Sequence, residues 1–228
     1  MTFHQPDHYL ASLLRYFFTS VCIVLIGLVS WNHYADLGWS SKPILMVAST
    51  AFVLISLCSG ALRSRYGCLI LTALVFCWLG DLGGSYQFLV GAGFFLVGHL
   101  FLIAAFWAYG VDYRRMGWAF VLLLLGSGGI ASWMLPSVFA GEQVFVVGYI
   151  AALSLMTGFA MGTRGTGFHW IVSIAAIAFY VSDLLLAIGR YKEIPVDYTY
   201  FGYPIYYASC VMFAWSVMVY TNERSNSH

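Results

Sequence analysis

Long apolar runs with almost no charge are the feature that most limits how this chain can fold. Of its 228 residues, 61% are hydrophobic and only 8% are charged, whereas about a quarter of the residues of a soluble domain carry a charge. A membrane-spanning helix needs roughly 17 to 25 mainly apolar residues. The sequence therefore predicts an integral membrane protein.

Polar, glycine and proline residues divide the chain into eight apolar segments. We predict an all-α bundle of eight transmembrane helices, forming one domain over residues 1–228. The predicted spans are about 13–30, 43–58, 66–86, 88–109, 118–134, 144–161, 168–189 and 203–220.

The basic residues give this bundle an orientation. Under these spans, one face collects most of the basic residues, Arg15, Arg63, Arg65, Arg114, Arg115, Arg164 and Arg224, and the other holds Lys42, Arg190 and Lys192. Cytoplasmic loops are enriched in Lys and Arg. We therefore expect both termini in the cytoplasm, and the host membrane to be a bacterial inner (plasma) membrane.

The overall charge and the cysteines exclude several classes of function. A net charge of +1 provides no basic face for nucleic acid, so no nucleic-acid partner is expected. Five cysteines lie scattered in apolar segments without a CxxC spacing, as small buried hydrophobes would. We expect no cleaved signal peptide, because His4, Pro6, Asp7 and His8 precede the first apolar run. The sequence leaves the oligomeric state open.

Two carboxylates interrupt the apolar runs. Asp81 lies in Phe76-Cys-Trp-Leu-Gly-Asp-Leu-Gly-Gly-Ser-Tyr86, and Asp183 lies in Ala178-Phe-Tyr-Val-Ser-Asp-Leu-Leu-Leu-Ala187. Ionisable groups inside a membrane are costly and usually functional. The plain alternative is a structural ion pair with Lys42 or Arg190. We predict that the fold brings the two acids together.

The surroundings of the two acids resemble each other. Each Asp follows an aromatic residue, a gap and a small residue, and each precedes a leucine. In the predicted topology their helices run in the same direction. A tandem repeat of four helices would explain this match, as in transporters with internal symmetry, although five residues can also match by coincidence.

Several other polar residues are candidates for the same site. His99 falls near the middle of its span, where it either orients a carboxylate or water, or is a hydrogen-bonded core residue. The hydroxyl candidates near the outer ends of the last two spans are Tyr180, Ser182, Tyr203, Tyr206 and Tyr207, each of which could instead be a packing residue. No histidine has ligand spacing with His99, so no metal site is predicted. Nor does the chain contain a GxSxG nucleophile motif. Gly91, Gly93 and Gly98 predict a close helix contact.

Taken in order, these motifs resemble the lysoplasmalogenase family, also called YhhN-like. The resemblance rests on Ser41-Lys42-Pro43, on Leu79-Gly80-Asp81, on the Gly-Phe-Phe-x-x-Gly-His run that ends at His99, and on Tyr180-Val-Ser-Asp183-Leu-Leu-Leu-Ala187. It extends from about Trp39 to Tyr220. Gly83 and Gly84 depart from it, because bulkier apolar residues are expected after Asp81.

The resemblance implies a hydrolase that cleaves the vinyl ether bond of lysoplasmalogens to a fatty aldehyde and glycerophospho-ethanolamine or glycerophosphocholine. It implies Asp81 and Asp183 as the catalytic pair, with the roles of acid and base unassigned, and no metal or organic cofactor. The lysophospholipid substrate would contact Lys42, His99, Tyr180, Ser182, Arg190 and Tyr207, with Lys42 and Arg190 facing its phosphate.

Two rival functions remain open. A proton-coupled transporter would use the two acids as a proton relay. A metal-dependent intramembrane hydrolase would act on another lipid and would lose activity to a chelator.

Overall fold

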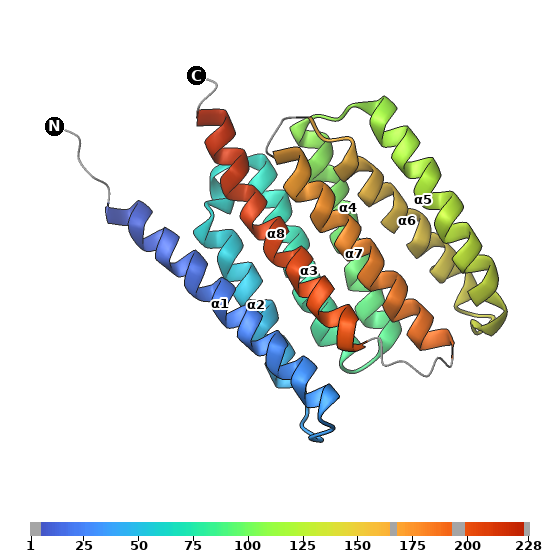
Figure 1. Ribbon diagram of the computed structural model, residues 1–228. Coiled ribbons are helices and arrows are strands. Elements are labelled where there is room, and N and C mark those ends of the chain that lie inside the picture. The colour runs from blue at the N-terminus through green and yellow to red at the C-terminus, as the bar shows by residue number, and fades with distance from the viewer. Residues whose placement is uncertain (1–5, 165–167, 193–198, 226–228) are drawn as a thin grey trace.

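The computed structural model describes residues 6–164, 168–192 and 199–225, and these residues form an antiparallel bundle of helices (Figure 1). Eight α-helices follow one another along this part of the chain, with short 3₁₀ turns at Ala61–Arg63 and Leu135–Ser137. Their bounds are α1 Pro6–Tyr34, α2 Lys42–Cys58, α3 Arg65–Gly84, α4 Phe88–Tyr109, α5 Tyr113–Met134, α6 Gln143–Met161, α7 Phe168–Tyr191 and α8 Thr199–Ser225.

Six of these helices, α1 and α3 to α7, are long and apolar enough to cross a membrane. Large apolar side chains on the outer surface, such as Leu100, Leu122 and Leu125, are more than half exposed, as expected for a surface that contacts lipid tails. The protein is therefore an all-helical, multi-pass membrane protein. Helix α2 is apolar but has only 17 residues, and α8 is not among the six. The prediction of eight spans is thus met for six helices.

Local sequence explains where several helices begin and end. Pro43 occupies the first turn of α2, where its missing N–H costs no hydrogen bond. Gly60 ends this segment with a φ of 82°, which glycine adopts without strain. Asp112 begins α5 by accepting hydrogen bonds from the backbone amides of Arg114 (3.0 Å) and Arg115 (3.2 Å). The amide of Arg115, followed by that of Arg114, holds the pKa of Asp112 below its usual value.

Some helices extend beyond the predicted spans. Helix α1 begins at Pro6 rather than near residue 13, α5 begins at Tyr113 rather than near residue 118, and α8 is longer at both ends. The predicted bounds followed hydrophobicity, whereas backbone hydrogen bonding continues a helix through polar turns outside the apolar layer. The predicted polar loop after Lys192 lies largely outside the described residues.

Six helices close into a ring. The pairs α2–α3, α3–α4, α4–α6, α6–α7, α7–α8 and α8–α2 all pack against each other, so the ring returns to its start. Helix α1 lies outside the ring against α2 and α8, and α5 lies outside it against α6 (Figure 1).

The packing of the first four helices is repeated by the last four. Helix α1 packs on α2 as α5 packs on α6, α3 packs on α4 as α7 packs on α8, and α4 neighbours α6 as α8 neighbours α2. Helices α3 and α7 run in the same direction in Figure 1. This order of packing agrees with the four-plus-four tandem repeat, except that α1 packs on α8 whereas α5 makes no comparable contact with α4 among the described residues.

Candidate functional site

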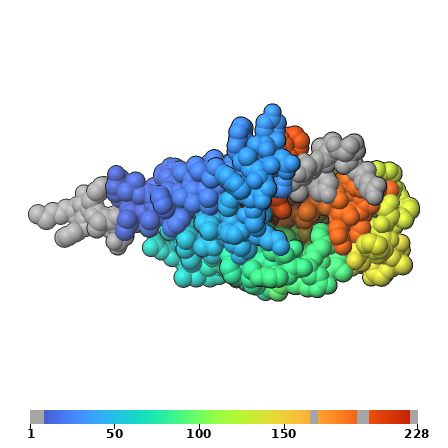
Figure 2. All heavy atoms as spheres, turned by 90° about the horizontal axis from the view of Figure 1, so that it is seen from below, coloured from blue at the N-terminus to red at the C-terminus, as the bar shows by residue number. Residues whose placement is uncertain are grey.

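A cavity of about 260 Å³ lies inside the ring, toward the end at which α3 and α7 finish and α4 and α8 begin. Figure 2 looks at this end of the molecule. All six ring helices contribute to its wall, and no described residue of α1 or α5 does. Most of the lining side chains are apolar, among them Leu45, Phe88, Phe95, Val146 and Ile150.

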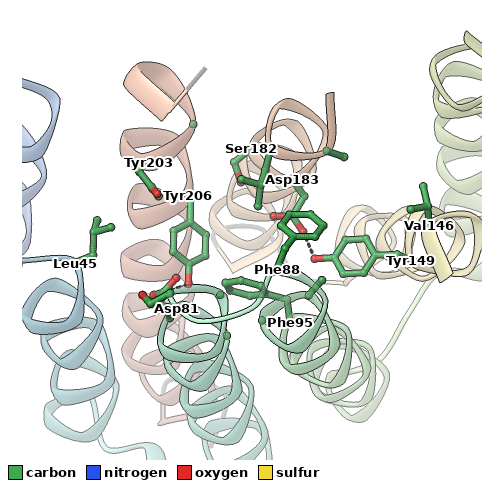
Figure 3. Close-up of a pocket in the computed structure, with 18 of the residues that line it drawn as sticks. Leu45, Asp81, Phe88, Phe95, Val146, Tyr149, Ser182, Asp183, Tyr203 and Tyr206 are labelled. Atoms are coloured by element: carbon green, nitrogen blue, oxygen red, sulfur yellow. Dashed lines mark hydrogen bonds between the residues drawn. The ribbon is translucent and has the colours of Figure 1, made fainter. Parts of the chain in front are cut away.

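Asp81 and Asp183 both line this cavity, from α3 and α7 (Figure 3). The fold therefore brings the two acids to one chamber, where the sequence predicted that they would meet. Asp81 is half-buried, and Asp183 is 8% exposed. The two carboxyl groups have different surroundings.

Asp81 is surrounded by hydroxyl groups. Ser49 of α2 donates a hydrogen bond to its Oδ2, and Tyr206 (3.1 Å) and Tyr207 (3.3 Å) of α8 reach the same atom. The Tyr207 hydroxyl also lies 2.9 Å from Ser49 Oγ and 3.0 Å from the carbonyl oxygen of Leu45. Asp81 is thus part of a hydroxyl network contributed by three helices.

Asp183 has one hydroxyl donor and one histidine beside it. Tyr149 of α6 donates to its Oδ2 at 2.6 Å. His99 of α4 is fully buried, and its Nε2 lies 3.5 Å from the same oxygen. Neither nitrogen of His99 has a hydrogen-bond partner among the described residues. The imidazole instead meets the rings of Tyr149 and Phe179 edge-on, with centroids 5.4 and 4.9 Å away.

Aromatic rings form part of the cavity wall near the two carboxyl groups. Phe95 packs directly on Gly80, where a Cβ atom would lie 2.8 Å from the ring. Its edge contacts Tyr206 (centroids 5.6 Å apart) and Phe179 (6.4 Å). In Figure 3 the Phe95 ring lies beside Asp81, and the Phe88 ring is drawn over Asp183. The acids therefore face one cavity from α3 and α7, and apolar rings form part of the wall that they share.

Basic residues lie around the mouth of the cavity. Lys42, at the start of α2, lines it and donates from Nζ to the carbonyl oxygen of Ser85 at 2.8 Å. Arg190 lies outside the lining, with its guanidinium 5.2 Å from the ring centroid of Phe88, which does line it. Lys192, in contrast, lies away from the lining, over the ring of Trp133 on α5 at 4.7 Å. The rim can therefore hold an anionic group.

The other predicted site residues fall into three groups according to where their side chains lie relative to the cavity. Ser182 lines the cavity, although its hydroxyl donates to the carbonyl oxygen of Phe179. His99 and Tyr207 lie behind the two acids and contact them. Tyr180 points away: its hydroxyl donates to the carbonyl oxygen of Leu123 on α5 at 3.0 Å. Its polar group is thus used between helices, and Tyr180 is not among the residues that line the cavity.

Ser49 and Tyr149 were missed by the sequence interpretation. A serine in an apolar helix and a tyrosine in a membrane span are both common, so neither stood out. The repeat offered a usable signal, since Ser49 precedes Asp81 by 32 residues and Tyr149 precedes Asp183 by 34. Among the described residues, no three His, Cys, Asp or Glu side chains are grouped so as to hold a metal ion.

The fold and the cavity define a class of protein, the polytopic helical membrane protein with two carboxylates in an intramembrane cavity. Within this class, the YhhN family model matches residues 37–217 of the chain. The protein belongs to the YhhN family, which includes lysoplasmalogenases. The matched range contains all of the ring except the last turns of α8, and it leaves out α1. Comparisons with curated proteins and with solved structures gave no match.

Proposed function

We propose that this protein is a membrane-embedded hydrolase that cleaves the vinyl ether bond of lysoplasmalogens, releasing a fatty aldehyde and glycerophospho-ethanolamine or glycerophosphocholine. The observation that carries the proposal is the meeting of Asp81 and Asp183, from different halves of the chain, in one apolar cavity. Membership of the YhhN family supports it.

Two carboxyl groups suit the chemistry of a vinyl ether. Hydrolysis begins with protonation of the outer alkene carbon, the one that does not carry the ether oxygen. This step produces an oxocarbenium ion, which water then attacks. A protonated carboxyl group can deliver the proton, and a carboxylate can stabilise the cation and take a proton from the water. The reaction requires no group beyond the chain's own side chains and water.

The cavity also suits a single-chain phospholipid. Its apolar wall matches an alkenyl chain, and the ammonium group of Lys42 at the mouth offers a charge-assisted contact for the phosphate. Arg190, beside Phe88, is the second candidate for this contact. In this arrangement the vinyl ether, which joins the chain to the glycerol, lies near the depth of the two acids.

The test measures aldehyde release by the purified protein from a lysoplasmalogen. Asp81→Asn and Asp183→Asn should each lower kcat by at least about 100-fold, the contribution typical of a general acid or base, and leave the melting temperature close to that of the parent protein. Asp36→Asn is the matched control, because Asp36 is exposed and Asn tolerates its φ of 48°. Turnover near the parent rate in either cavity variant would remove that residue from the chemistry.

A proton-coupled transporter is the second candidate, favoured by the repeated packing of the two halves around a site with two acids. A carrier would release no aldehyde from any lysoplasmalogen. It would instead acidify the lumen of proteoliposomes as its solute enters, and Asp81→Asn would abolish that proton movement. The aldehyde assay and the proteoliposome assay therefore give opposite results for the two candidates.

A further inference from the structure

The hydroxyl groups around the two acids differ in a way that assigns their roles. Building on the proposed hydrolase, we propose that Asp183 delivers the proton to the alkene carbon and that Asp81 acts as the carboxylate, stabilising the cation and activating the water. Family resemblance leaves this assignment open, and the contacts of the two side chains supply it.

Asp81 has the surroundings of an ionised group. Hydroxyl donors stabilise the charged form of a carboxylate. Ser49 and Tyr207 each also reach the carbonyl oxygen of Leu45, so one of their hydrogens can satisfy that carbonyl. Even then, Tyr206 and the other hydroxyl remain to donate to Asp81. Asp81 is also the more exposed of the two acids, which brings water within its reach.

Asp183 has the surroundings of a neutral group. It is 8% exposed, and the Tyr149 hydroxyl donates to it; the Ser182 hydroxyl also lies beside the carboxyl group, but its hydrogen is donated to the carbonyl oxygen of Phe179. An ionised carboxylate in so apolar a place requires pairing or several donors. His99 does not supply that pairing, since its Nε2 is 3.5 Å from Oδ2, longer than the 2.7 to 2.9 Å typical of a charged pair. Both nitrogens of His99 lack partners, as expected for a neutral imidazole beside a neutral carboxyl group.

No other charged group of the described structure alters this contrast. Neither acid has a Lys or Arg within ion-pair distance among the described residues, and Lys42 at the mouth donates to Ser85 O instead. The titratable neighbours of Asp81 are Cys22 of α1, with Tyr206, Tyr207 and Cys210 of α8. Those of Asp183 are His99 of α4 and Tyr149 of α6, with Asp81 across the cavity.

Each acid keeps one oxygen available for the reaction. The described hydrogen bonds and ion contacts of both side chains involve Oδ2. Oδ1 of each acid takes no part in these contacts. The proton of Asp183 that is transferred is therefore placed on Oδ1, while Tyr149 holds Oδ2 in position.

The assignment gives a balanced cycle. Asp183 transfers its proton to the outer alkene carbon, and the vinyl ether becomes an oxocarbenium ion. Water adds to the cationic carbon and gives one proton to Asp81, forming a hemiacetal. The hemiacetal then collapses: its hydroxyl proton returns to Asp183, its bond to the glycerol oxygen breaks, and Asp81 protonates that oxygen. Aldehyde and alcohol leave, and both acids are back in their starting forms.

The test compares two matched Tyr→Phe variants through the pH dependence of kcat/KM. Activity should rise at low pH as Asp81 ionises and fall at high pH as Asp183 loses its proton. Tyr206→Phe removes a donor to the ionised Asp81. The acidic limb of the kcat/KM profile should therefore move to higher pH by roughly half to one unit, while the basic limb stays in place. Tyr149→Phe removes the donor to Asp183, which then keeps its proton longer. The basic limb of the profile of this variant should therefore move to higher pH by a similar amount.

Tyr180→Phe serves as the control, because its hydroxyl is bonded to Leu123 O outside the cavity, and both limbs should stay in place. The crossed result, with Tyr206→Phe moving the basic limb and Tyr149→Phe the acidic one, would reverse the assignment. Unmoved limbs in both variants would also overturn it. In either case aldehyde would still be released, so the proposed function would stand.

Chemical rescue provides a second measurement if a Tyr→Phe variant fails to fold. Formate added to Asp183→Gly should restore activity in its protonated form, so the rescue should weaken as the pH rises. Formate added to Asp81→Gly should act as the anion, and that rescue should strengthen with pH. The opposite pair of dependences would contradict the assignment.

Discussion

At the scale of single residues, Lys42 is the side chain whose effect on substrate binding can be separated from chemistry. Its Nζ reaches the last turn of α3, where it bonds Ser85 O and lies at the cavity mouth. A charged hydrogen bond to phosphate contributes about 1.5 to 3 kcal/mol. Lys42→Gln should therefore raise KM for a lysoplasmalogen about tenfold or more and change kcat little.

An alkenylglycerol without phosphate isolates this effect, because parent and Lys42→Gln proteins should have similar KM values for it. Lys192→Gln is the matched control, since the Lys192 ammonium lies on the Trp133 ring and its loss should change neither KM. If Lys42→Gln raised KM equally for both substrates, its role would be to hold α2 against α3 rather than to bind phosphate.

The residues themselves explain which parts of the site the sequence could predict. Asp81 and Asp183 stand out because an acid in an apolar helix is rare and costly. Their partners Ser49 and Tyr149 do not stand out, because hydroxyl side chains are ordinary in such helices. Recognising them requires the register of α2 on α3 and of α6 on α7, which the side chains set only when the helices pack.

At the scale of helices, the α3–α4 contact depends on small residues. A Cβ atom on Gly91 would lie 2.6 Å from Gly84 Cα and 2.7 Å from Gly80 O, whereas one on Gly93 would meet nothing within 4 Å. Gly91→Ala should therefore destabilise the protein by about 1 to 3 kcal/mol through overpacking, and lower activity by moving α3 beneath Asp81. Gly93→Ala should be neutral or slightly stabilising.

Thermal unfolding in detergent gives the melting temperature of each variant. Because both replace Gly by Ala within α4, the difference between the two melting temperatures excludes the effect of Ala on helix propensity. Equal melting temperatures would contradict the close contact. The sequence predicted this contact for Gly91, Gly93 and Gly98, and it is confirmed for Gly91 and Gly98, which meet α3 backbone or side chains. It is wrong for Gly93, because residues two apart on a helix face different directions, whereas residues seven apart share a face.

The repeated packing of the two halves explains how two different acid environments arise at similar places. Ser49 and Tyr149 come from the equivalent helices α2 and α6, and Tyr206 and His99 come from the equivalent helices α8 and α4. The repeated helices place side chains at matching positions around each acid, and different residue types at those positions give the two acids different surroundings. The five-residue match around the acids indicated this repeat, but the order in which the helices pack required the structure.

The repeat and the basic residues together predict how the molecule sits in the membrane. We propose that all eight helices cross a bacterial inner membrane, with both termini in the cytoplasm and the cavity mouth outside.

Helix α2 is the sharpest test of this topology because it has only 17 residues. Trp39→Cys and Leu62→Cys flank it at positions 57% and 71% exposed. In a background with the native cysteines replaced, an impermeant maleimide should label Trp39→Cys on intact cells and Leu62→Cys only after permeabilisation. A fluorescent protein fused after residue 228 should fluoresce, which it does only in the cytoplasm. Labelling of both cysteines from the same side would mean that α2 does not cross, and exchanged accessibilities would place the cavity mouth, and with it the substrate head group, in the cytoplasm.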